Sequence, residues 1–257
     1  MYSPFYGDFM KVLILKNAEA VASFTANYVI EKINAFVPTK EKPYFVLGLP
    51  TGSTPIPVYQ MLVKAYQEGE VSFKNVVTFN MDEYKGLPAE HDQSYHYFMQ
   101  ENLFKHIDIP SEQVHILDGM ALDTKTECKN YEEKIKSFGG IDIQLAGIGE
   151  NGHLAFNEPG TSFDSLTHLQ KLTDDTIEVN SRFFTKKEDV PQYALTVGLK
   201  TVYDAKEVFV LATGDKKANA IYQSIRAERG EDCPASILQE HKGAFFVCDE
   251  GAAKKLK

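Results

Sequence analysis

Short apolar runs recur along the chain, and the segments between them are mostly long enough to hold a helix. Most of these runs are almost continuously apolar, which is the pattern of strands that are covered on both faces of a parallel sheet. The predicted strands are residues 11–15, 44–49, 75–79, 141–146, 193–197, 207–212 and 243–248.

The segments between the strands have the period of amphipathic helices. In residues 55–67, the side chains of Val58, Met61, Leu62 and Ala65 follow the i, i+3, i+4, i+7 spacing of one helix face. Further helices are predicted at 17–36, 94–105, 124–138 and 215–228. This alternation predicts an α/β fold, with a doubly wound, mostly parallel, Rossmann-like sheet and helices on both faces.

The chain contains no internal repeat, low-complexity tract or Pro/Gly/Ser linker. We therefore expect one domain over residues 10–257, with residues 1–9 as a peripheral extension, because Met10 directly precedes the first predicted strand. Doubly wound sheets bind ligands outside the carboxyl ends of their strands. Functional residues are thus expected just after the apolar runs.

The composition is acidic, since 27 Lys and Arg residues stand against 36 Asp and Glu, a formal net charge of −9. Nucleic acids and anionic membranes are bound through basic patches, so neither is expected as a partner. The three cysteines have no metal-binding or C-x-x-C spacing, as is usual in a reducing compartment. No apolar run reaches the ~20 residues of a membrane span and the start lacks secretory features, so a cytoplasmic location is expected.

Gly147, Gly149 and Gly152 have the G-x-G-x-x-G spacing of a dinucleotide-binding turn. That turn requires a helix that begins inside it, and Pro159 would break such a helix after only a few residues. The motif also falls in the middle of the chain and not in the first strand–helix unit. A nicotinamide or flavin cofactor is therefore not expected.

The same glycines allow a sharp loop at a strand end that presents Asn151, His153 and Glu158. Taken alone, the loop is equally compatible with a plain turn whose His and Glu side chains bind backbone groups. The spacing differs from that of zinc-binding motifs such as H-E-x-x-H, so no metal site is expected.

Thr51, Gly52, Ser53 and Thr54 lie between the second strand and a helix that is predicted to begin with Thr54 as N-cap and Pro55 as first residue. A plain helix cap explains only the last two of these residues. A glycine turn with several hydroxyls at a helix N-terminus is typical of an anion site. The absence of G-K-[ST] favours a phosphomonoester over a nucleotide.

Three further basic side chains are candidates for the same anion. Lys216 and Lys217 open a predicted helix, where the helix dipole disfavours cations, and Arg182 lies in the stretch NSRFF. Solvated surface side chains are the alternative explanation for all three.

Asp82 and Glu83 follow the third strand in NVVTFNMDEY. Consecutive residues point in different directions, so only one of the two is expected to face a ligand. A partly desolvated carboxylate can act as a base on an acidic C–H bond. The alternative is a helix cap or turn residue.

Together these motifs are recognisable. LGLPTGSTP, TFNMDEY, SYHYFM, GIGENGHLAFNEPG, NSRFF and VPQYALTVG, in this order, make the chain from about Met10 resemble the glucosamine-6-phosphate deaminases of the glucosamine-6-phosphate isomerase/6-phosphogluconolactonase superfamily. The resemblance implies conversion of glucosamine 6-phosphate and water to fructose 6-phosphate and ammonia, without a metal or organic cofactor.

The resemblance also implies roles for individual residues. Asp82 would move a proton from C2 to C1, and His153 would open the sugar ring with Asn151 and Glu158 orienting it. The substrate phosphate would be held by the residues of the turn and two basic side chains, namely Thr51, Gly52, Ser53, Thr54, Arg182 and Lys217.

Two departures from the family's pattern stand out. Asn151 replaces an Asp of some members and removes a charge beside His153. The Arg and Lys with which allosteric members bind N-acetylglucosamine 6-phosphate are replaced by His168 and Gln170. We therefore expect no such activation, and a monomer or small homo-oligomer.

Three other functions are compatible with parts of the pattern. A 6-phosphogluconolactonase would share the phosphate site and the histidine but needs no enolising base. A galactosamine-6-phosphate deaminase differs in substrate by one hydroxyl. A non-catalytic sugar-phosphate sensor would not need Asp82, His153 and Glu158 together.

Overall fold

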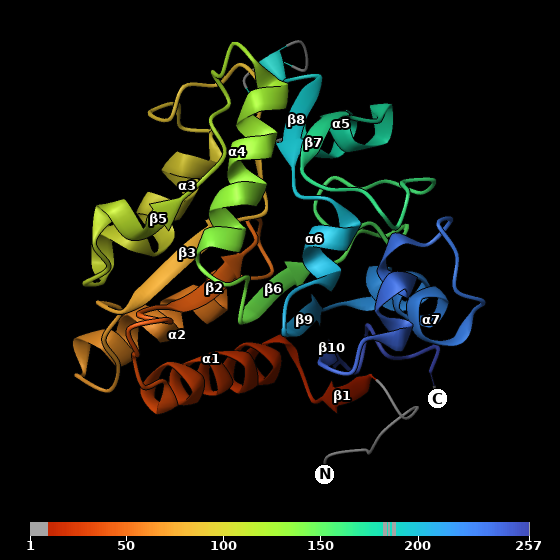
Figure 1. The fold of residues 1–257 in the computed structure, drawn as a ribbon. Coiled ribbons are helices and arrows are strands. Elements are labelled where there is room, and N and C mark those ends of the chain that lie inside the picture. Colours follow the sequence, from red (N-terminus) through yellow and green to blue (C-terminus); the bar gives the residue numbers. More distant parts are fainter. Residues whose placement is uncertain (1–9, 182–183, 185, 187–188, 257) are drawn as a thin grey trace.

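The computed structural model describes residues 10–181, 184, 186 and 189–256. Over these residues the chain forms a seven-stranded sheet in the order β1-β10-β9-β6-β2-β3-β5, in which every neighbouring pair is parallel (Figure 1). Its strands are β1 (Lys11–Leu15), β2 (Phe45–Leu49), β3 (Val76–Asn80), β5 (Val114–His115), β6 (Ile143–Gly147), β9 (Glu207–Ala212) and β10 (Ala244–Asp249).

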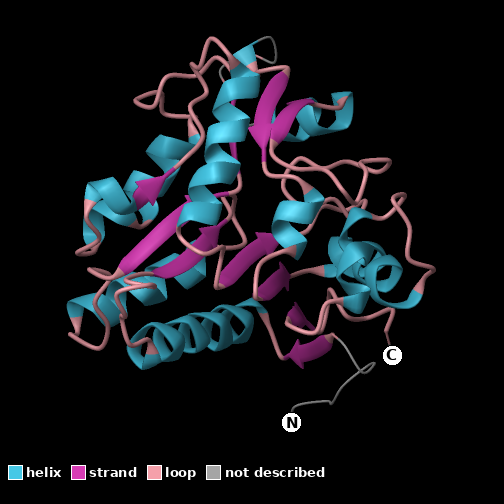
Figure 2. Ribbon diagram, in the orientation of Figure 1, coloured by secondary structure: helices cyan, strands magenta, loops and turns pink. Residues whose placement is uncertain are grey.

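Helices cover both faces of this sheet (Figure 2). The helices of the described residues are α1 (Ala18–Ala35), α2 (Ile56–Gln67), α3 (Tyr95–Asn102), α4 (Thr124–Ser137), α5 (Asp174–Ser181), α6 (Leu199–Tyr203) and α7 (Ala218–Arg226), of which α5 lies beside β7 and β8 and not on the large sheet. Short 3-10 turns are η1 (Phe104–His106), η2 (Ser111–Gln113), η4 (Asp215–Lys217) and η5 (Pro234–Glu240). Polar caps start several helices: the side chain of Asn17 accepts a hydrogen bond from the amide of Ala20 at α1, and Ser94 does the same for Tyr97 at α3.

Alternate residues of the strands feed two separate hydrophobic cores. In β2, Val46 packs on one face with residues of α4, α6 and α7. Its neighbours Phe45 and Leu47 pack on the other face with α1, α2 and α3. The predicted doubly wound α/β fold with helices on both faces is therefore confirmed.

A three-stranded antiparallel sheet also forms among the described residues, in the order β4-β8-β7. It consists of β4 (Asp82–Tyr84), β7 (His168–Lys171) and β8 (Tyr193–Thr196). The prediction that residues 193–197 form a strand of the large sheet is therefore wrong. Most of β8 is buried because it is the middle strand of the small sheet, and this burial gives it the apolar run of a central parallel strand.

Several predicted helix boundaries also differ from the structure. The helix predicted over 94–105 ends at Asn102, and its continuation is the separate turn η1. The helix predicted over 215–228 begins as η4 and becomes α-helical only at Ala218. Within the described residues, none of the helices has the length and apolarity required to cross a membrane.

Candidate functional site

The large sheet has a topological switch point, at which the chain stops adding strands on one side and continues on the other. From β2 the chain proceeds through β3 to β5 at one edge, and then returns to β6 on the other side of β2. This point between β2 and β6 is the usual ligand site of a doubly wound sheet. The Thr51–Thr54 turn follows β2 and the loop with His153 follows β6, so both leave the sheet at this point.

The other candidates follow the two flanking strands, β3 and β9. Asp82 comes two residues after the end of β3, and Lys217 closes the turn that follows β9. The four segments with sequence-predicted site residues thus leave four consecutive strands, β9, β6, β2 and β3, at their carboxyl ends.

Asp82 is a buried carboxylate without a full set of partners. Its side chain lies on β4 opposite Thr196 of β8, and the residue is 7% exposed. Among the described residues, no donor reaches its Oδ1 atom. Burial raises the pKa of Asp82 to about 8, with a further contribution from the negative charge of Glu83. Such a group can release and take up a proton near neutral pH.

Glu83 has a different environment from its neighbour. Its Oε1 accepts hydrogen bonds from the amides of Tyr84 and Tyr95, and its Oε2 accepts one from the amide of His96. The His96 imidazole Nδ1 lies 3.0 Å from the same Oε2. The carboxylate of Glu83 therefore holds the N-terminal turn of α3, which leaves Asp82 as the acid of this pair that has an unpaired oxygen.

The loop after β6 brings three candidate residues together. The Asn151 amide donates a hydrogen bond to Oε2 of Glu158 over 2.7 Å, and its Oδ1 accepts one from the amide of His153. Nδ1 of His153 lies 3.6 Å from Oε2 of Glu158, within ion-pair distance. Burial raises the pKa of Glu158, but interactions with His153, Asn151 and Thr176 outweigh it and lower this pKa to about 2.

The backbone of the loop is bent sharply between His153 and Glu158. Ala155 has a φ of 52°, in the left-handed region that residues with a Cβ rarely adopt. The Asn157 amide fixes the bend through hydrogen bonds to the carbonyl groups of Leu154 and Val197. The amide of Phe156 donates to the Thr196 hydroxyl, which ties the loop to the strand that pairs with Asp82.

Substitution by alanine is expected to have different effects at two glycines of the G-x-G-x-x-G motif, because only one of them is in close contact with another side chain. A Cβ at Gly149 would lie 2.3 Å from Nδ1 of His153, whereas one at Gly147 would meet nothing within 4 Å. We expect Gly149→Ala to displace the imidazole, to lower at least tenfold the rate of a reaction in which His153 takes part, and to cost about 1–3 kcal/mol in stability. Gly147→Ala is the matched control, and should retain the wild-type rate and the wild-type stability. Steady-state kinetics and urea unfolding measure this, and equal losses in the two variants would contradict it.

The turn after β2 contains a glycine in the left-handed region of the backbone and leads into α2. Gly52 has a φ of 96°, which favours glycine. One detail of the prediction is wrong: α2 begins at Ile56 with Pro55 in the capping position, and no side chain caps it. The hydroxyl of Thr54 therefore does not cap this helix.

Lys217 differs from its neighbour Lys216 in exposure. The Lys217 side chain is partly buried, and this burial lowers its pKa, while the charge of Glu150 raises it and that of Lys216 lowers it. Lys216 is exposed. The preceding turn is fixed because the amide of Gly214 donates to both oxygens of Asp249. Arg182, the other predicted phosphate ligand, lies outside the described residues.

His168 and Gln170, which occupy the two positions where allosteric members of the family are expected to carry Arg and Lys, lie on β7. His168 Nε2 and Gln170 Oε1 are 3.2 Å apart, and Nδ1 of the same imidazole contacts the carbonyl of Leu166. Neither residue contributes a fixed positive charge.

The sequence did not indicate three residues that organise the site. Thr176 on α5 donates a hydrogen bond to Glu158, Thr196 binds the loop, and the ring of Tyr95 packs against Tyr84 of β4 and Phe156 of the loop. Tyr95 could have been noticed, because it stands in the motif SYHYFM. Thr176 lies in a polar stretch without periodicity, and Thr196 looks like an ordinary strand residue.

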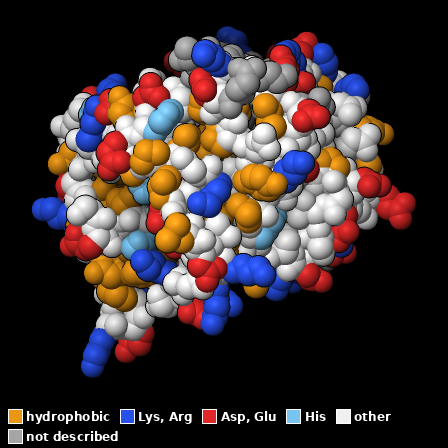
Figure 3. Space-filling model, turned by 90° about the horizontal axis from the view of Figure 1, so that it is seen from above, with side chains coloured by type: hydrophobic (Ala, Val, Ile, Leu, Met, Phe, Trp, Pro, Cys, Tyr) orange, Lys and Arg blue, Asp and Glu red, His pale blue; other side chains and the backbone are white. Residues whose placement is uncertain are grey.

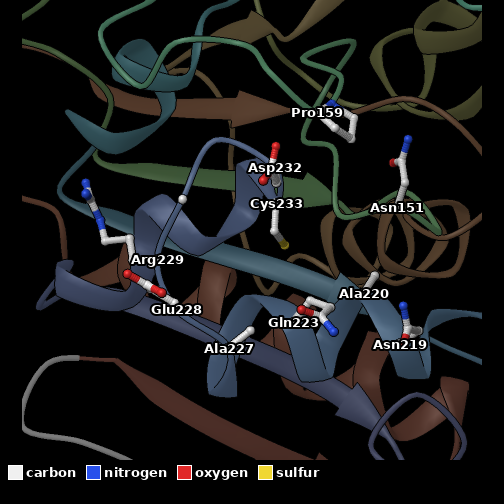
Figure 4. Close-up of a pocket in the computed structure, with 11 residues that line it drawn as sticks. Asn151, Pro159, Asn219, Ala220, Gln223, Ala227, Glu228, Arg229, Asp232 and Cys233 are labelled. Atoms are coloured by element: carbon white, nitrogen blue, oxygen red, sulfur yellow. The ribbon is translucent and has the colours of Figure 1, made fainter.

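A pocket of about 660 Å³ lies between the loop after β6 and helix α7 (Figure 4). Asn151 and Pro159 line it on one side, and Asn219 and Gln223 of α7 line it on the other. Asp82, Lys217 and the turn after β2 do not line it. Cys233 does, and a Cβ at Gly152 would lie 2.7 Å from its sulfur, so the glycine permits close packing of the loop against residues 230–235.

Among the described residues, His, Cys, Asp and Glu side chains are not gathered in groups of three or more that could hold a metal ion. On the face seen in Figure 3, basic, acidic and apolar side chains are interspersed. The arrangement as a whole offers a buried carboxyl group with a raised pKa, a histidine within ion-pair distance of a carboxylate, and a glycine turn that leads into a helix.

A doubly wound sheet with this set of groups at its switch point is the architecture of an α/β enzyme. The chain belongs to the family described as glucosamine-6-phosphate isomerases/6-phosphogluconolactonase, whose sequence model matches residues 16–247. The resemblance inferred from the motifs is thereby confirmed.

Relatives across the full length have consistent names. A glucosamine-6-phosphate deaminase of Glaesserella parasuis is 53% identical over 249 residues, which cover 96% of this chain and 94% of that protein. One of Treponema denticola is also 53% identical, with 96% and 92% covered. A solved monomeric glucosamine-6-phosphate deaminase superposes with a TM-score of 0.90 at 40% identity, covering 96% of this chain and 100% of that one. A 6-phosphogluconolactonase from Thermotoga maritima shares the fold, with a TM-score of 0.72 at 24% identity over 93% of this chain and 98% of that one.

Proposed function

We propose that the protein is a glucosamine-6-phosphate deaminase, which converts glucosamine 6-phosphate and water to fructose 6-phosphate and ammonia. The observation that carries the proposal is the buried carboxylate of Asp82, whose Oδ1 lacks a partner among the described residues at the carboxyl ends of the strands. Relatives of that name at about half identity over the full chain support it. The proposed enzyme is one domain over residues 10–257, with residues 1–9 as an extension, and acts in amino-sugar catabolism in the cytoplasm.

The proposed reaction begins with ring opening at His153. The imidazole takes the proton of the C1 hydroxyl and returns a proton to the ring oxygen, which gives the open-chain aldehyde. Imidazole is suited to both transfers because histidine titrates near neutral pH in general. The carboxylate of Glu158, 3.6 Å from Nδ1, stabilises the transient positive charge.

Asp82 performs the second proton transfer in the proposed reaction. Acting on the ammonium form of the open-chain amino aldehyde, its carboxylate removes the proton from C2 while a proton of the ammonium group passes to O1, which gives a neutral enolamine. The carboxyl group then returns its proton to C1, which gives an iminium group at C2. Water then adds to C2 and ammonia leaves, so that fructose 6-phosphate remains. The phosphate, held by Thr51–Thr54, Arg182 and Lys217, supplies binding energy remote from the reacting atoms and fixes their orientation.

The decisive assay measures ammonia and fructose 6-phosphate from glucosamine 6-phosphate in metal-free buffer. Equal amounts of the two products support the proposal. Release of acid from 6-phosphogluconolactone without ammonia from the amino sugar would favour a lactonase. Binding of phosphosugars without either product would favour a sensor. The same assay with galactosamine 6-phosphate decides the preference between the epimers.

Lys217→Met is expected to raise KM for glucosamine 6-phosphate roughly 10- to 100-fold, because a charge-assisted contact to phosphate is worth about 1.5–3 kcal/mol. The value of kcat should change much less, since the phosphate does not react. Lys216→Met is the matched control, as Lys216 is exposed and should leave KM unchanged. Equal increases in KM would assign the effect to the general charge of the helix end.

The proposal extends to regulation and assembly. With His168 and Gln170 at the positions discussed above, N-acetylglucosamine 6-phosphate should not activate the enzyme, because two fixed charges favourable to phosphate are lacking. We propose a monomer or small homo-oligomer. Initial rates at sub-saturating substrate with and without this effector test the first point, and marked activation would refute it.

A further inference from the structure

The two oxygens of Glu158 face different parts of the molecule. Oε2 accepts a hydrogen bond from Asn151 and lies 3.6 Å from Nδ1 of His153. Oε1 accepts a hydrogen bond of 2.8 Å from the hydroxyl of Thr176, which belongs to α5. Glu158 is 8% exposed, so these protein groups take the place of most of its hydration.

Thr176 is itself held in position at the start of α5. Thr173 precedes the helix, and its hydroxyl accepts a hydrogen bond from the amide of Thr176 and donates one to the Thr176 hydroxyl. One residue further along α5, Ile177 packs against a buried cluster that includes Tyr84 of β4 and Phe156 of the loop. The first turn of α5 is thus attached both to the strand of Asp82 and to the loop of His153.

We infer that Thr176 is a positioning residue for the His153–Glu158 pair, an inference that rests on the proposed function. The terminal torsion of a glutamate side chain has a broad, weakly restrained energy profile. A carboxylate bound only through Oε2 could turn about that torsion and move Oε2 away from His153. The hydroxyl of Thr176 holds Oε1, and therefore keeps Oε2 directed at the imidazole during proton transfer.

The positioning role predicts a loss in kcat and not in KM. Thr176→Val replaces the hydroxyl with a methyl group of similar size, and should lower kcat about tenfold with KM within about twofold of wild type, as expected for one hydrogen bond to a charged group. Thr176→Ser restores the hydroxyl and should recover kcat to within about twofold of wild type. A rise in KM alone, or a serine variant as slow as the valine variant, would overturn the inference.

A double-mutant cycle separates this role from a general effect on folding. In a Glu158→Ala background, Thr176→Val should change kcat by less than about twofold, because its acceptor is already absent. Thr161→Val is the matched control, since the hydroxyl of Thr161 donates to the backbone carbonyl of Glu158 and not to its carboxylate. If Thr176→Val lowered kcat tenfold in both backgrounds, the effect would come from a disturbance of α5 and not from the hydrogen bond to Glu158.

Urea unfolding as a function of pH tests the contact without any assay of activity. The pKa of Glu158 in the folded protein is lowered to about 2. The ionised side chain therefore contributes to the free energy of unfolding above its ordinary pKa of about 4.3, and this contribution is lost as the pH falls toward 2. Loss of the Thr176 donor raises this pKa. The urea midpoint of Thr176→Val should therefore lie below that of wild type at pH 7, and the gap should narrow below pH 4.

His153 is the titratable group within ion-pair distance of this carboxylate among the described residues, and it is present in both proteins, so the difference between them reports the Thr176 contact. For Thr161→Val the gap should not depend on pH. A gap for Thr176→Val that is equally independent of pH would overturn the inference. If the wild-type protein releases no ammonia, the proposed function fails, while the unfolding result still decides whether Thr176 stabilises the charged form of Glu158.

Discussion

Replacing Asp82 with Asn should lower kcat for deamination by about a thousandfold, within the range that positioned general bases contribute. The amide has nearly the same shape as the carboxylate but cannot take the proton from C2. Binding of the phosphosugar should stay within about twofold of wild type, because the phosphate contacts are unchanged. Asp92→Asn makes the same chemical change at a side chain that is 73% exposed, and should leave kcat unaltered. A kcat for Asp82→Asn near that of wild type would remove Asp82 from the mechanism.

The same substitution should increase stability at alkaline pH. A folded-state pKa of about 8 lies above the ordinary value for Asp, so the folded protein keeps a proton that the unfolded chain loses between about pH 4 and 8. The stability that this residue contributes is thus present below pH 4 and lost as the pH rises through 8. Asp82→Asn cannot ionise, and should raise the thermal unfolding midpoint at pH 8.5 but not at pH 4. Equal unfolding midpoints of the two proteins at pH 8.5 would show that ionisation of Asp82 does not destabilise the folded protein.

Replacing His153 with Gln should lower kcat about a hundredfold, because the amide can form hydrogen bonds but cannot accept and return a proton. The defect should lie in ring opening. An open-chain alditol form of the substrate, which has no ring to open, should therefore bind the variant and wild type with equal affinity. Isothermal titration calorimetry with this compound, beside kinetics with glucosamine 6-phosphate, measures both quantities.

His106→Gln is the matched control for this experiment, because His106 is exposed and its imidazole contacts the backbone carbonyl of Glu101. It should retain wild-type kcat. If His153→Gln lost affinity for the alditol by the same factor as it lost kcat, the imidazole would serve in binding and not in ring opening.

The sequence was informative about the large sheet because five of its long strands, β2, β3, β6, β9 and β10, are buried along almost their whole length and alternate with helical segments. It misplaced residues 193–197, since burial in the small sheet produces the same apolar run as burial in the large one. β4 and β7 were not predicted because they are short and carry polar residues such as Asp82 and His168. No local pattern records that segments so distant in sequence pair with each other.

For the site, the loops were predictable because glycine, proline and hydroxyl residues have strong local preferences. The environments of the side chains were not. The raised pKa of Asp82 depends on burial by the completed fold, and the bonds of Glu83 to α3 depend on where that helix begins. Thr176 acts through a contact with a residue on another segment, and such contacts follow from tertiary packing alone.

The winding of the chain through the large sheet also has a consequence for synthesis on the ribosome. Asp82 lies on β4, which pairs with β8, and the strand before Lys217 is β9, in the last quarter of the chain. A nascent chain that has completed β2, β3, β6 and the loop after β6 already has the Thr51–Thr54 turn and the loop with His153, but the strand of Asp82 has no partner. Because every such pairing joins distant segments, native secondary structure should form before catalytic competence during folding. The cell would then receive no activity from an unfinished chain.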